Sequence, residues 1–310
     1  MITVLAGGIG AAKFLEGLVA VMPPEQITVI ANTGDDAEIH GLHISPDMDT
    51  VLYTLAGVVN RESGWGIAGD TFHALGALAR LKEETWFQLG DQDLTTHLYR
   101  TRRLREGARL SEVSSELCRR FVVRCRLIPM TNDPAATRLR TSAGELSFQE
   151  YFVKLRQEPE VLAVDLSAAE CSKPAPGVIE AILDAQGVII APSNPIISIG
   201  PILAVPGILD ALRNTPAPVA AISPIVGGKA LKGPADRMMN SLGFGSSAAA
   251  VAELYRDFVD VFVLDEQDSA LQAKVESKGM RALVTQTIMH SAEAKQNLAL
   301  TISASLQDKR

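Results

Sequence analysis

Short, uninterrupted apolar runs alternate with stretches of helical periodicity along most of this chain. Seven runs are predicted as strands: Ile2–Ala6, Ile27–Ala31, Val161–Leu166, Gly187–Ala191, Val219–Ile222, Val261–Leu264 and Ala282–Gln286. A strand that is apolar along its whole length is typical of a parallel sheet with helices on both faces. Parallel neighbours require right-handed crossovers between them. The sequence therefore predicts an α/β fold with a doubly wound, mostly parallel Rossmann-like sheet.

One segment, about residues 82–157, departs from this rhythm because it is richer in charge and mostly helical in pattern. No linker rich in Pro, Gly or Ser separates it from its neighbours, so it is predicted as an insertion into the sheet domain. The 310 residues, 47% of them hydrophobic, are enough for one large core. We expect a single Rossmann-like domain over residues 1–310 that carries a mostly helical insertion.

Composition narrows the functional class. A net charge of −7 argues against general nucleic-acid binding. The three cysteines are odd in number and lack CxxC spacing, which indicates a reducing compartment and no zinc site. No basic leader precedes the first apolar run, and prolines interrupt the uncharged stretch at 185–209, so neither a signal peptide nor a membrane helix is expected. We predict a cytoplasmic protein, with a homodimer as the expected assembly.

The first predicted strand runs directly into a glycine-rich loop, Gly7-Gly8-Ile9-Gly10. Glycines at a helix N-terminus allow backbone N–H groups to approach a phosphate, where the helix dipole also favours negative charge. Gly8 and Gly10 are therefore candidate nucleotide-binding residues, against the alternative of a purely structural tight turn. Lys13 stands where the last glycine of GxGxxG would be, and it is either a further phosphate contact or an ordinary surface lysine.

Four aspartates follow the second predicted strand: Asp35 and Asp36, then Asp47 and Asp49. Two adjacent carboxylates are more than the ribose of a dinucleotide needs. Magnesium in proteins is bound through one or two carboxylates together with phosphate oxygens and water. The cluster predicts metal or substrate contact for at least one of these residues. The alternative is that Asp47 and Asp49 only cap turns and the next helix.

Polar and glycine-rich loops also follow later strands. Ser193 and Asn194 come after the strand at 187–191. Gly227 and Gly228 come after the strand at 219–222, ahead of a further stretch with lysine and glycine at 232–236. Because the carboxyl ends of parallel strands meet at one edge of a sheet, these loops together predict a nucleotide crevice.

Two further features have two interpretations each. His97 is either a catalytic residue or a structural hydrogen-bonding residue. The segment 98–126 contains nine arginines and three glutamates. It forms either an electrostatic funnel for a polyanionic substrate or a solvated helix face.

Several longer motifs select one family. They are GGIGAAK at 7–13, NTGDD at 32–36, SPDMDTVLYTLAG at 45–57, LGDQDLTTHL at 89–98, APSNPIISIGPIL at 191–203, SPIVGGKALKGPAD at 223–236 and VFVLDEQD at 261–268. With these motifs, nearly the whole chain resembles the 2-phospho-L-lactate transferase family, which acts in the biosynthesis of the deazaflavin coenzyme F-420.

The resemblance implies a magnesium-dependent transferase with two small-molecule substrates. The terminal ribityl hydroxyl of 7,8-didemethyl-8-hydroxy-5-deazariboflavin would attack the phosphorus that carries the acid of a guanosine-diphosphate-activated donor, and GMP would leave. Mg²⁺ would lie near Asp35, Asp36 and Asp49, with Asp35 and Asp49 as catalytic residues. The residues expected to bind the substrates are Gly8, Gly10, Lys13, Ser193, Asn194, Gly227 and Gly228 on the nucleotide side, and Gln88 at a position of deazaflavin contact.

The sequence departs from the family pattern at Gln92, which replaces the usual arginine, and Gln88 adds no charge. The acid of the donor therefore stays open among phospholactate, phosphoenolpyruvate and 3-phosphoglycerate. A nucleotide-sugar-binding regulator of the same superfamily, without transferase activity, is the main alternative. An NAD-dependent oxidoreductase is disfavoured by Lys13 in the glycine motif and by the lack of an obvious acid or base for hydride transfer.

Overall fold

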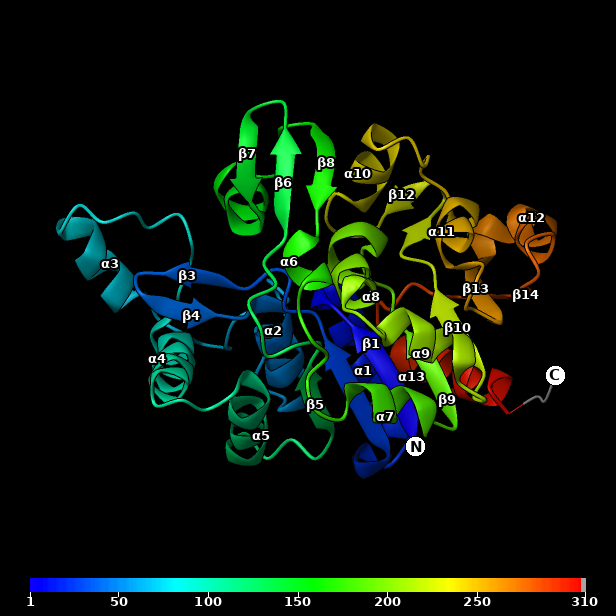
Figure 1. The fold of residues 1–310 in the computed structure, drawn as a ribbon, viewed down its shortest axis with the longest axis horizontal. Coiled ribbons are helices and arrows are strands. Elements are labelled where there is room, and N and C mark those ends of the chain that lie inside the picture. Colours follow the sequence, from blue (N-terminus) through cyan, green and yellow to red (C-terminus); the bar gives the residue numbers. More distant parts are fainter. Residues whose placement is uncertain (308–310) are drawn as a thin grey trace.

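A seven-stranded, wholly parallel sheet forms the centre of the computed structural model, which describes residues 1–307 (Figure 1). Its strands are β1 (Ile2–Ala6), β2 (Ile27–Ala31), β5 (Arg126–Pro129), β9 (Gly187–Ile190), β10 (Val219–Ile222), β13 (Val261–Asp265) and β14 (Arg281–Thr285). Their order is β14-β13-β10-β9-β1-β2-β5. The predicted α/β fold with a doubly wound parallel sheet is confirmed.

Alternate residues of each strand point to opposite sides of the sheet, so both of its faces are apolar and both are covered by helices. On one face, Val4 and Val29 pack with α1 (Gly8–Val21), α2 (Pro46–Leu55), α5 (Leu110–Arg120) and α13 (Ala292–Ser305). On the other, Leu5 and Ile30 pack with α7 (Val178–Leu183), α8 (Gly200–Ala204), α9 (Ile208–Asn214), α11 (Ala248–Tyr255) and α12 (Gln272–Glu276). The two layers account for strands that are apolar along their whole length.

The segment 82–157 is less helical than its charge pattern predicts. It contains α4 (Asp91–Arg105) and α5, but also β5, an edge strand of the central sheet, and the antiparallel pair β6 (Arg138–Thr141) and β7 (Gly144–Ser147). Much of it is therefore the crossover from β2 to β5 rather than an addition outside the sheet. Strand β5 has only four residues and begins with an exposed arginine, so its sequence gives little strand signal.

The strand predicted at Val161–Leu166 is present as β8 (Val161–Asp165), but it lies outside the central sheet. It pairs antiparallel with β6 in a small sheet of order β7-β6-β8. Only Val161 of this strand is fully buried, in contrast to the wholly buried β1 and β2. An antiparallel sheet tolerates such exposure because one of its faces can meet solvent.

The remaining elements are short connections. They are the hairpins β3 (Ala37–Ile39) with β4 (Leu42–Ile44) and β11 (Ile225–Val226) with β12 (Lys229–Ala230), the helices α3 (His73–Arg80), α6 (Ser167–Glu170) and α10 (Ala235–Ser241), the 3₁₀ turns η1 (Pro24–Gln26) and η4 (Glu266–Leu271), and the π-helical turns η2 (Glu150–Lys154) and η3 (Pro195–Ile199). Hairpin β3–β4 and α3 project from one side of the molecule (Figure 1). No single helix among the described residues is long and apolar enough to cross a membrane.

The order in which the chain adds strands to the sheet reverses at β1. Its neighbours are β2 on one side and β9 on the other, so the chain leaves β1 and β9 toward opposite faces. A crevice forms at the carboxyl ends of such a pair because the two following loops diverge. The candidate site is therefore expected between the loops after Ala6 and Ile190.

Candidate functional site

A cleft of about 560 Å³ opens at this position, at the carboxyl edge of the sheet. It is lined by residues that follow β1, β2, β9, β10 and β14, together with parts of α2, α4 and η2. The predicted site residues that line it are Gly8, Gly10, Lys13, Asp35, Asp49, Gln88, Ser193 and Asn194. Asp36, Gly227 and Gly228 do not line it.

The glycine-rich loop lines the cleft and leads into α1. Gly8 has a φ of 70°, in the left-handed region that favours glycine. A Cβ at Gly10 would come within 2.1 Å of the Pro192 carbonyl oxygen, so the absence of a side chain lets α1 approach the loop after β9. No side chain caps the first turn of α1, which leaves its N–H groups for a ligand.

Ser193 and Asn194 hold the opposite loop. The Ser193 hydroxyl donates to the Gly7 carbonyl oxygen at 2.6 Å and so ties the two loops of the crevice together. The side-chain oxygen of Asn194 accepts N–H groups from Ile196 and Ile197 and caps the turn η3. This fixes the orientation of the Asn194 amide, whose buried nitrogen has no partner among the described residues. Asn194 therefore presents a free donor at the cleft.

Two carboxylates face each other beside the glycine loop. Asp35 accepts the backbone N–H of Asp47 at 3.0 Å, and the Asn32 amide nitrogen lies 2.9 Å from Asp47 Oδ2 and 3.4 Å from Asp35 Oδ1. Burial, with the charge of Asp47, raises the pKa of Asp35 well above its usual range. Burial also raises the pKa of Asp47 to about 7. Desolvation is the larger cause of both shifts, and the charge of Asp36 adds to each of them.

The other two predicted metal ligands, Asp36 and Asp49, have protein partners instead. Asp36 turns away from the cleft, and its Oδ2 lies 2.9 Å from His43 Nε2 and accepts the Ser45 hydroxyl at 3.0 Å. Asp49 is buried and paired through both oxygens with the Arg100 guanidinium. The structure thus does not bring Asp35, Asp36 and Asp49 together, and no group of three or more metal-ligating side chains occurs in residues 1–307.

His97 belongs to a buried chain of polar groups between α2 and α4. Its Nδ1 lies 3.1 Å from Arg100 Nη1 and must accept, since a guanidinium only donates. The ring proton is then on Nε2, which lies 3.1 Å from Asp93 Oδ1 without the alignment of a hydrogen bond. Asp93 Oδ1 accepts the Tyr53 hydroxyl at 2.7 Å. Burial opposes ionisation of Asp93, yet the neighbouring His97 and the Tyr53 hydroxyl hold its pKa below the usual range. The buried Nε2 has no hydrogen-bond partner among the described residues, and His97 lines the cleft, so the structure leaves both interpretations of His97 open.

The hairpin β11–β12 directs Gly227 and Gly228 away from the cleft. The Gly227 N–H donates to Asp268 Oδ2 at 3.0 Å, so this part of the loop is occupied by protein contacts. The residues that do reach the cleft come next in the chain: Leu231, Lys232, Gly233, Pro234 and Ala235. The sequence predicted that this loop reaches the cleft, but its pattern did not show which glycines and lysines line it.

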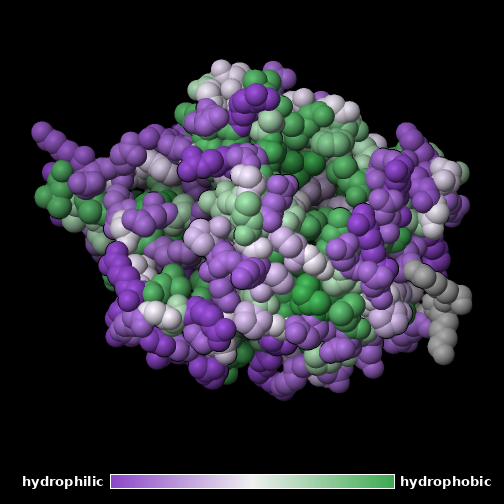
Figure 2. Space-filling view, viewed as in Figure 1, coloured by the Kyte–Doolittle hydropathy of each residue, from purple (hydrophilic) through white to green (hydrophobic). Residues whose placement is uncertain are grey.

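Aromatic and aliphatic side chains form the outer wall of the cleft, where Gln88 also lies. Phe152, in the π-helical turn η2, stacks on Phe148, which precedes the turn, and their ring centroids are 5.4 Å apart. Trp65 and Phe87 line the same cleft, and 42% of Trp65 is exposed. In the space-filling view, hydrophobic residues gather in the upper half, over β6, β8 and α10 (Figure 2). Such a wall suits a flat heteroaromatic ring.

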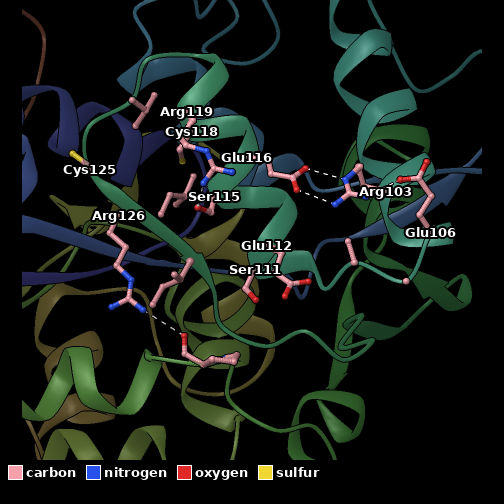
Figure 3. A pocket seen from close by; sticks show the side chains of 16 residues that line it. Arg103, Glu106, Ser111, Glu112, Ser115, Glu116, Cys118, Arg119, Cys125 and Arg126 are labelled. Carbon is pink, nitrogen blue, oxygen red and sulfur yellow. Dashed lines mark hydrogen bonds and ion pairs between the residues drawn. The ribbon is translucent and has the colours of Figure 1, made fainter.

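A second cavity, of about 810 Å³, lies between α4, α5 and β5 (Figure 3). Its charged groups neutralise one another: Arg103 pairs with Glu116 at 2.9 Å and with Glu106 at 2.7 Å. None of the predicted site residues lines it. The arginine-rich segment therefore lies on the surface of α4 and α5 and around this cavity, and its one member in contact with a residue lining the cleft is the buried Arg100.

Known proteins match this chain over nearly its full length. A family profile described as 2-phospho-L-lactate transferase CofD matches residues 2–304. A phosphoenolpyruvate transferase from Streptomyces coelicolor is 44% identical over 96% of this chain and 95% of its own length. A 2-phospho-L-lactate transferase from Methanothermobacter thermautotrophicus is 42% identical, over 96% of each chain.

A solved structure of a UPF0052 family member from Bacillus halodurans has a TM-score of 0.61 and covers 96% of this chain and 98% of its own. At 18% identity, that likeness supports the fold alone. The family match, in contrast, rests on sequence and includes the loops that build the cleft. This chain belongs to the CofD family of 2-phospho-L-lactate transferases.

Proposed function

We propose that this protein transfers a phosphate-linked three-carbon acid from a guanosine-diphosphate-activated donor to 7,8-didemethyl-8-hydroxy-5-deazariboflavin, in the biosynthesis of coenzyme F-420. The acid is phospholactate, phosphoenolpyruvate or 3-phosphoglycerate, and the first two correspond to the names of relatives. The observation that carries the proposal is the composition of one cleft. It combines an uncapped helix N-terminus, a buried pair of carboxylates and an aromatic wall.

In the proposed reaction, the ribityl hydroxyl oxygen forms a bond to the phosphorus that carries the acid. The bond from this phosphorus to the oxygen of GMP breaks, and the hydroxyl proton is lost. Such a displacement depends mostly on positioning and on neutralising charge. The nucleotide side would be formed by residues of the two loops that follow β1 and β9, which meet at the crevice. These residues are Gly8, Gly10, Ser193 and Asn194. Gln88 would lie on the deazaflavin side.

The proposal includes Mg²⁺, and the residues present fit it in part. Asp35 and Asp47 are buried or half-buried carboxylates with raised pKa values, and they supply the one or two carboxylates that magnesium takes. Phosphate oxygens and water would complete its coordination. Asp49 fits less well because Arg100 occupies both of its oxygens. Asp36 fits less well because it does not line the cleft, although only its Oδ2 has protein partners. The ion, when bound, would screen the negative charge of the diphosphate.

Asp49 fits the role of a fixed charge better than that of a proton acceptor. Arg100 binds both of its oxygens and holds the carboxylate in one orientation. Held in this way at the wall of the cleft, Asp49 would orient the attacking hydroxyl by accepting a hydrogen bond. Asp35 would act through the charge it places beside the glycine loop.

A reconstituted assay tests the proposal. The protein is incubated with the deazaflavin alcohol, GTP, Mg²⁺ and a donor-forming guanylyltransferase, with each of the three acids supplied separately. Mass spectrometry is expected to find a phosphodiester adduct of the deazaflavin with one of the acids. If no acid gives an adduct and the deazaflavin fluorescence is unchanged on mixing, the chain is a binding protein and the proposal is wrong.

We also propose a cytoplasmic location and a homodimeric assembly. All three cysteines are free thiols, and two of them are buried, which agrees with a reducing compartment. The homodimer is proposed because twofold assemblies are the commonest among soluble oligomers. Light scattering coupled to size exclusion would give the mass in solution, and a monomer would contradict that part.

A further inference from the structure

Two aspartates outside the cleft connect the helices α3 and α4. Asp70 precedes α3 and Asp91 begins α4, and each of them directly follows a glycine. Neither aspartate lines the cleft. Each carboxylate accepts backbone hydrogen bonds from the other helix, so that Asp70 binds α4 and Asp91 binds α3. The two side chains are therefore reciprocal caps that join the beginnings of the two helices.

Asp70 caps α4. Its Oδ1 accepts the Gln92 N–H at 2.8 Å, and its Oδ2 accepts the Asp93 N–H at 3.0 Å. These are the N–H groups of the second and third residues of the helix, which the side chain of the N-cap residue normally satisfies. Here the N-cap residue is Gly90, and a Cβ on it would lie 2.1 Å from Asp70 Oδ2. The absence of a side chain at Gly90 thus admits the carboxylate from the other element.

Asp91 caps α3 in return. Its Oδ1 accepts the Ala74 N–H at 2.9 Å, and its Oδ2 accepts the His73 N–H at 3.0 Å. The Thr71 hydroxyl also donates to Oδ2, at 2.6 Å, and the Asp91 N–H donates to the Thr71 carbonyl oxygen at 2.7 Å. The hydrogen bond from Thr71, followed by those from the backbone, holds the pKa of Asp91 below its usual range.

Packing contributes little to holding α3 in place. The helix projects from one side of the molecule, and Leu75 is its one buried residue (Figure 1). The hydrogen bonds of the reciprocal caps therefore carry much of the connection between α3 and α4.

The reciprocal caps fix residues that line the cleft on both sides of Asp91. Phe87 and Gln88 belong to the connection between α3 and α4, residues 81–90, which contains no helix or strand. Their position depends on where α4 begins relative to α3. Asp93, in the first turn of α4, also lines the cleft, and its own N–H is the one that Asp70 Oδ2 accepts.

We infer that Asp70 and Asp91 are positioning residues, which hold Phe87 and Gln88 at the outer wall of the cleft for the deazaflavin ring. The inference rests on the proposed function for the identity of this ligand. The nucleotide side is built from other elements, since the Ser193 hydroxyl ties the loops after β1 and β9 together. Loss of the reciprocal caps should therefore affect the deazaflavin and leave the nucleotide side intact.

Binding of each ligand alone separates this role from a general loss of structure. Deazaflavin affinity is measured by fluorescence, and GDP affinity by calorimetry with Mg²⁺. Asp70→Ala and Asp91→Ala are expected to lower deazaflavin affinity at least about fivefold, with GDP affinity unchanged. Asp91→Asn should retain most of the deazaflavin affinity, because asparagine caps a helix about as well as aspartate does.

The matched control is Asp165→Ala. Asp165 is an exposed aspartate that accepts the Ser167 N–H at 2.9 Å and does not line the cleft. This variant is expected to bind both ligands as the wild type does. If Asp70→Ala and Asp91→Ala match the control in deazaflavin affinity, or lose GDP affinity by the same factor as deazaflavin affinity, the inference is overturned.

Gly90→Ala tests the same contact without removing a charge. The new Cβ would displace the Asp70 carboxylate, so deazaflavin affinity should fall as it does in Asp70→Ala. The double variant should lose no more than either single variant, because both changes break one contact. Additive losses would contradict the inference.

Trp86 gives a measurement that does not depend on the proposed function. It lies in the connection between α3 and α4, with its ring centroid 5.9 Å from that of Phe87, and Trp65→Phe leaves it as the single tryptophan of the chain. In this background, Asp70→Ala and Asp91→Ala should increase the quenching of Trp86 by acrylamide. If the wild type binds no deazaflavin, the proposed function fails, and increased quenching still supports the positioning of this segment. Unchanged quenching overturns the inference.

Discussion

At the scale of single residues, Gly10 shows how close packing and the candidate site are linked. Its Cα lies so near the loop after β9 that a Cβ would come within 2.1 Å of the Pro192 carbonyl oxygen, and backbone cannot move aside as a flexible side chain can. Gly10→Ala is therefore expected to lower the free energy of unfolding by about 1–3 kcal/mol, as overpacking does. Urea denaturation measures the change.

The matched control for this variant is Gly76→Ala. Gly76 lies inside α3, and a Cβ there would meet no atom within 4 Å. Alanine favours a helix interior over glycine by about 0.5–1 kcal/mol, so this variant should be slightly more stable than the wild type. Equal effects of the two substitutions would show that helix propensity, and not the approach to Pro192, controls position 10.

Arg100 gives a second prediction at this scale. It is 2% exposed and neutralises Asp49, which is 4% exposed. Arg100→Met leaves a buried carboxylate without its cation, so a loss of about 3–5 kcal/mol in unfolding free energy is expected. The double variant Asp49→Asn with Arg100→Met should recover part of this loss. Chemical denaturation of the wild type, the single variants Arg100→Met and Asp49→Asn, and the double variant gives the coupling energy, and additive effects would contradict the pairing.

The aspartates after β2 show which part of the site could be predicted from the sequence. Because they follow the carboxyl end of this strand, the sequence correctly indicated that carboxylates line the cleft. Asp47 and Asp49, however, are two residues apart on α2, and such residues point about 200° apart around a helix axis. Only one of them can face Asp35, and it is Asp47. Helix rotation is set by packing between α2 and its neighbours, and the local sequence does not determine it.

At the scale of elements, continuous apolar runs predicted strands well. Strands β1 and β2 have the predicted bounds because every residue in them is buried on one face or the other. Strand β5 was missed because Arg126 and Pro129 mark its ends, and only its pairing with β2 makes it a strand. Strand β8 was assigned to the wrong sheet because pairing partners are set by long-range contacts.

Helix α13 provides a prediction for an element. It packs along α1, and its N-cap residue is Ser291, whose hydroxyl accepts the Ala294 N–H at 3.1 Å. Ser291→Ala should lower the free energy of unfolding by about 1 kcal/mol because it removes that cap. Ser291→Asp should retain the stability, since aspartate also caps and favours the helix dipole. Equal destabilisation by Ala and Asp in urea denaturation would contradict a capping role.

At the scale of the whole molecule, the buried carboxylates affect how stability depends on pH. The pKa of Asp47 is raised from 3.8 to about 7 by burial, so the folded state binds a proton more tightly than the unfolded state does. This contribution to stability is present below about pH 4 and is lost as the pH rises to about 7. With a chelator present, the Tm of the wild type should fall over this window, and it should fall less in Asp47→Asn.

Magnesium should reverse that loss. A divalent cation beside Asp35 and Asp47 compensates their charge and binds only the folded state, which raises Tm. Addition of Mg²⁺ above pH 7 is expected to raise the Tm of the wild type but not that of Asp47→Asn. The same rise in Asp47→Asn, measured by scanning calorimetry, would place the ion elsewhere.

The position of β1 between β2 and β9 has a consequence for synthesis on the ribosome. Strand β1 emerges first, but its second partner, Gly187–Ile190, is made only after more than half of the chain. Until then, the nascent protein carries an apolar strand with one unpaired edge, which is a template for association with other chains. The edge of β1 that borders the cleft is thus completed only late in translation.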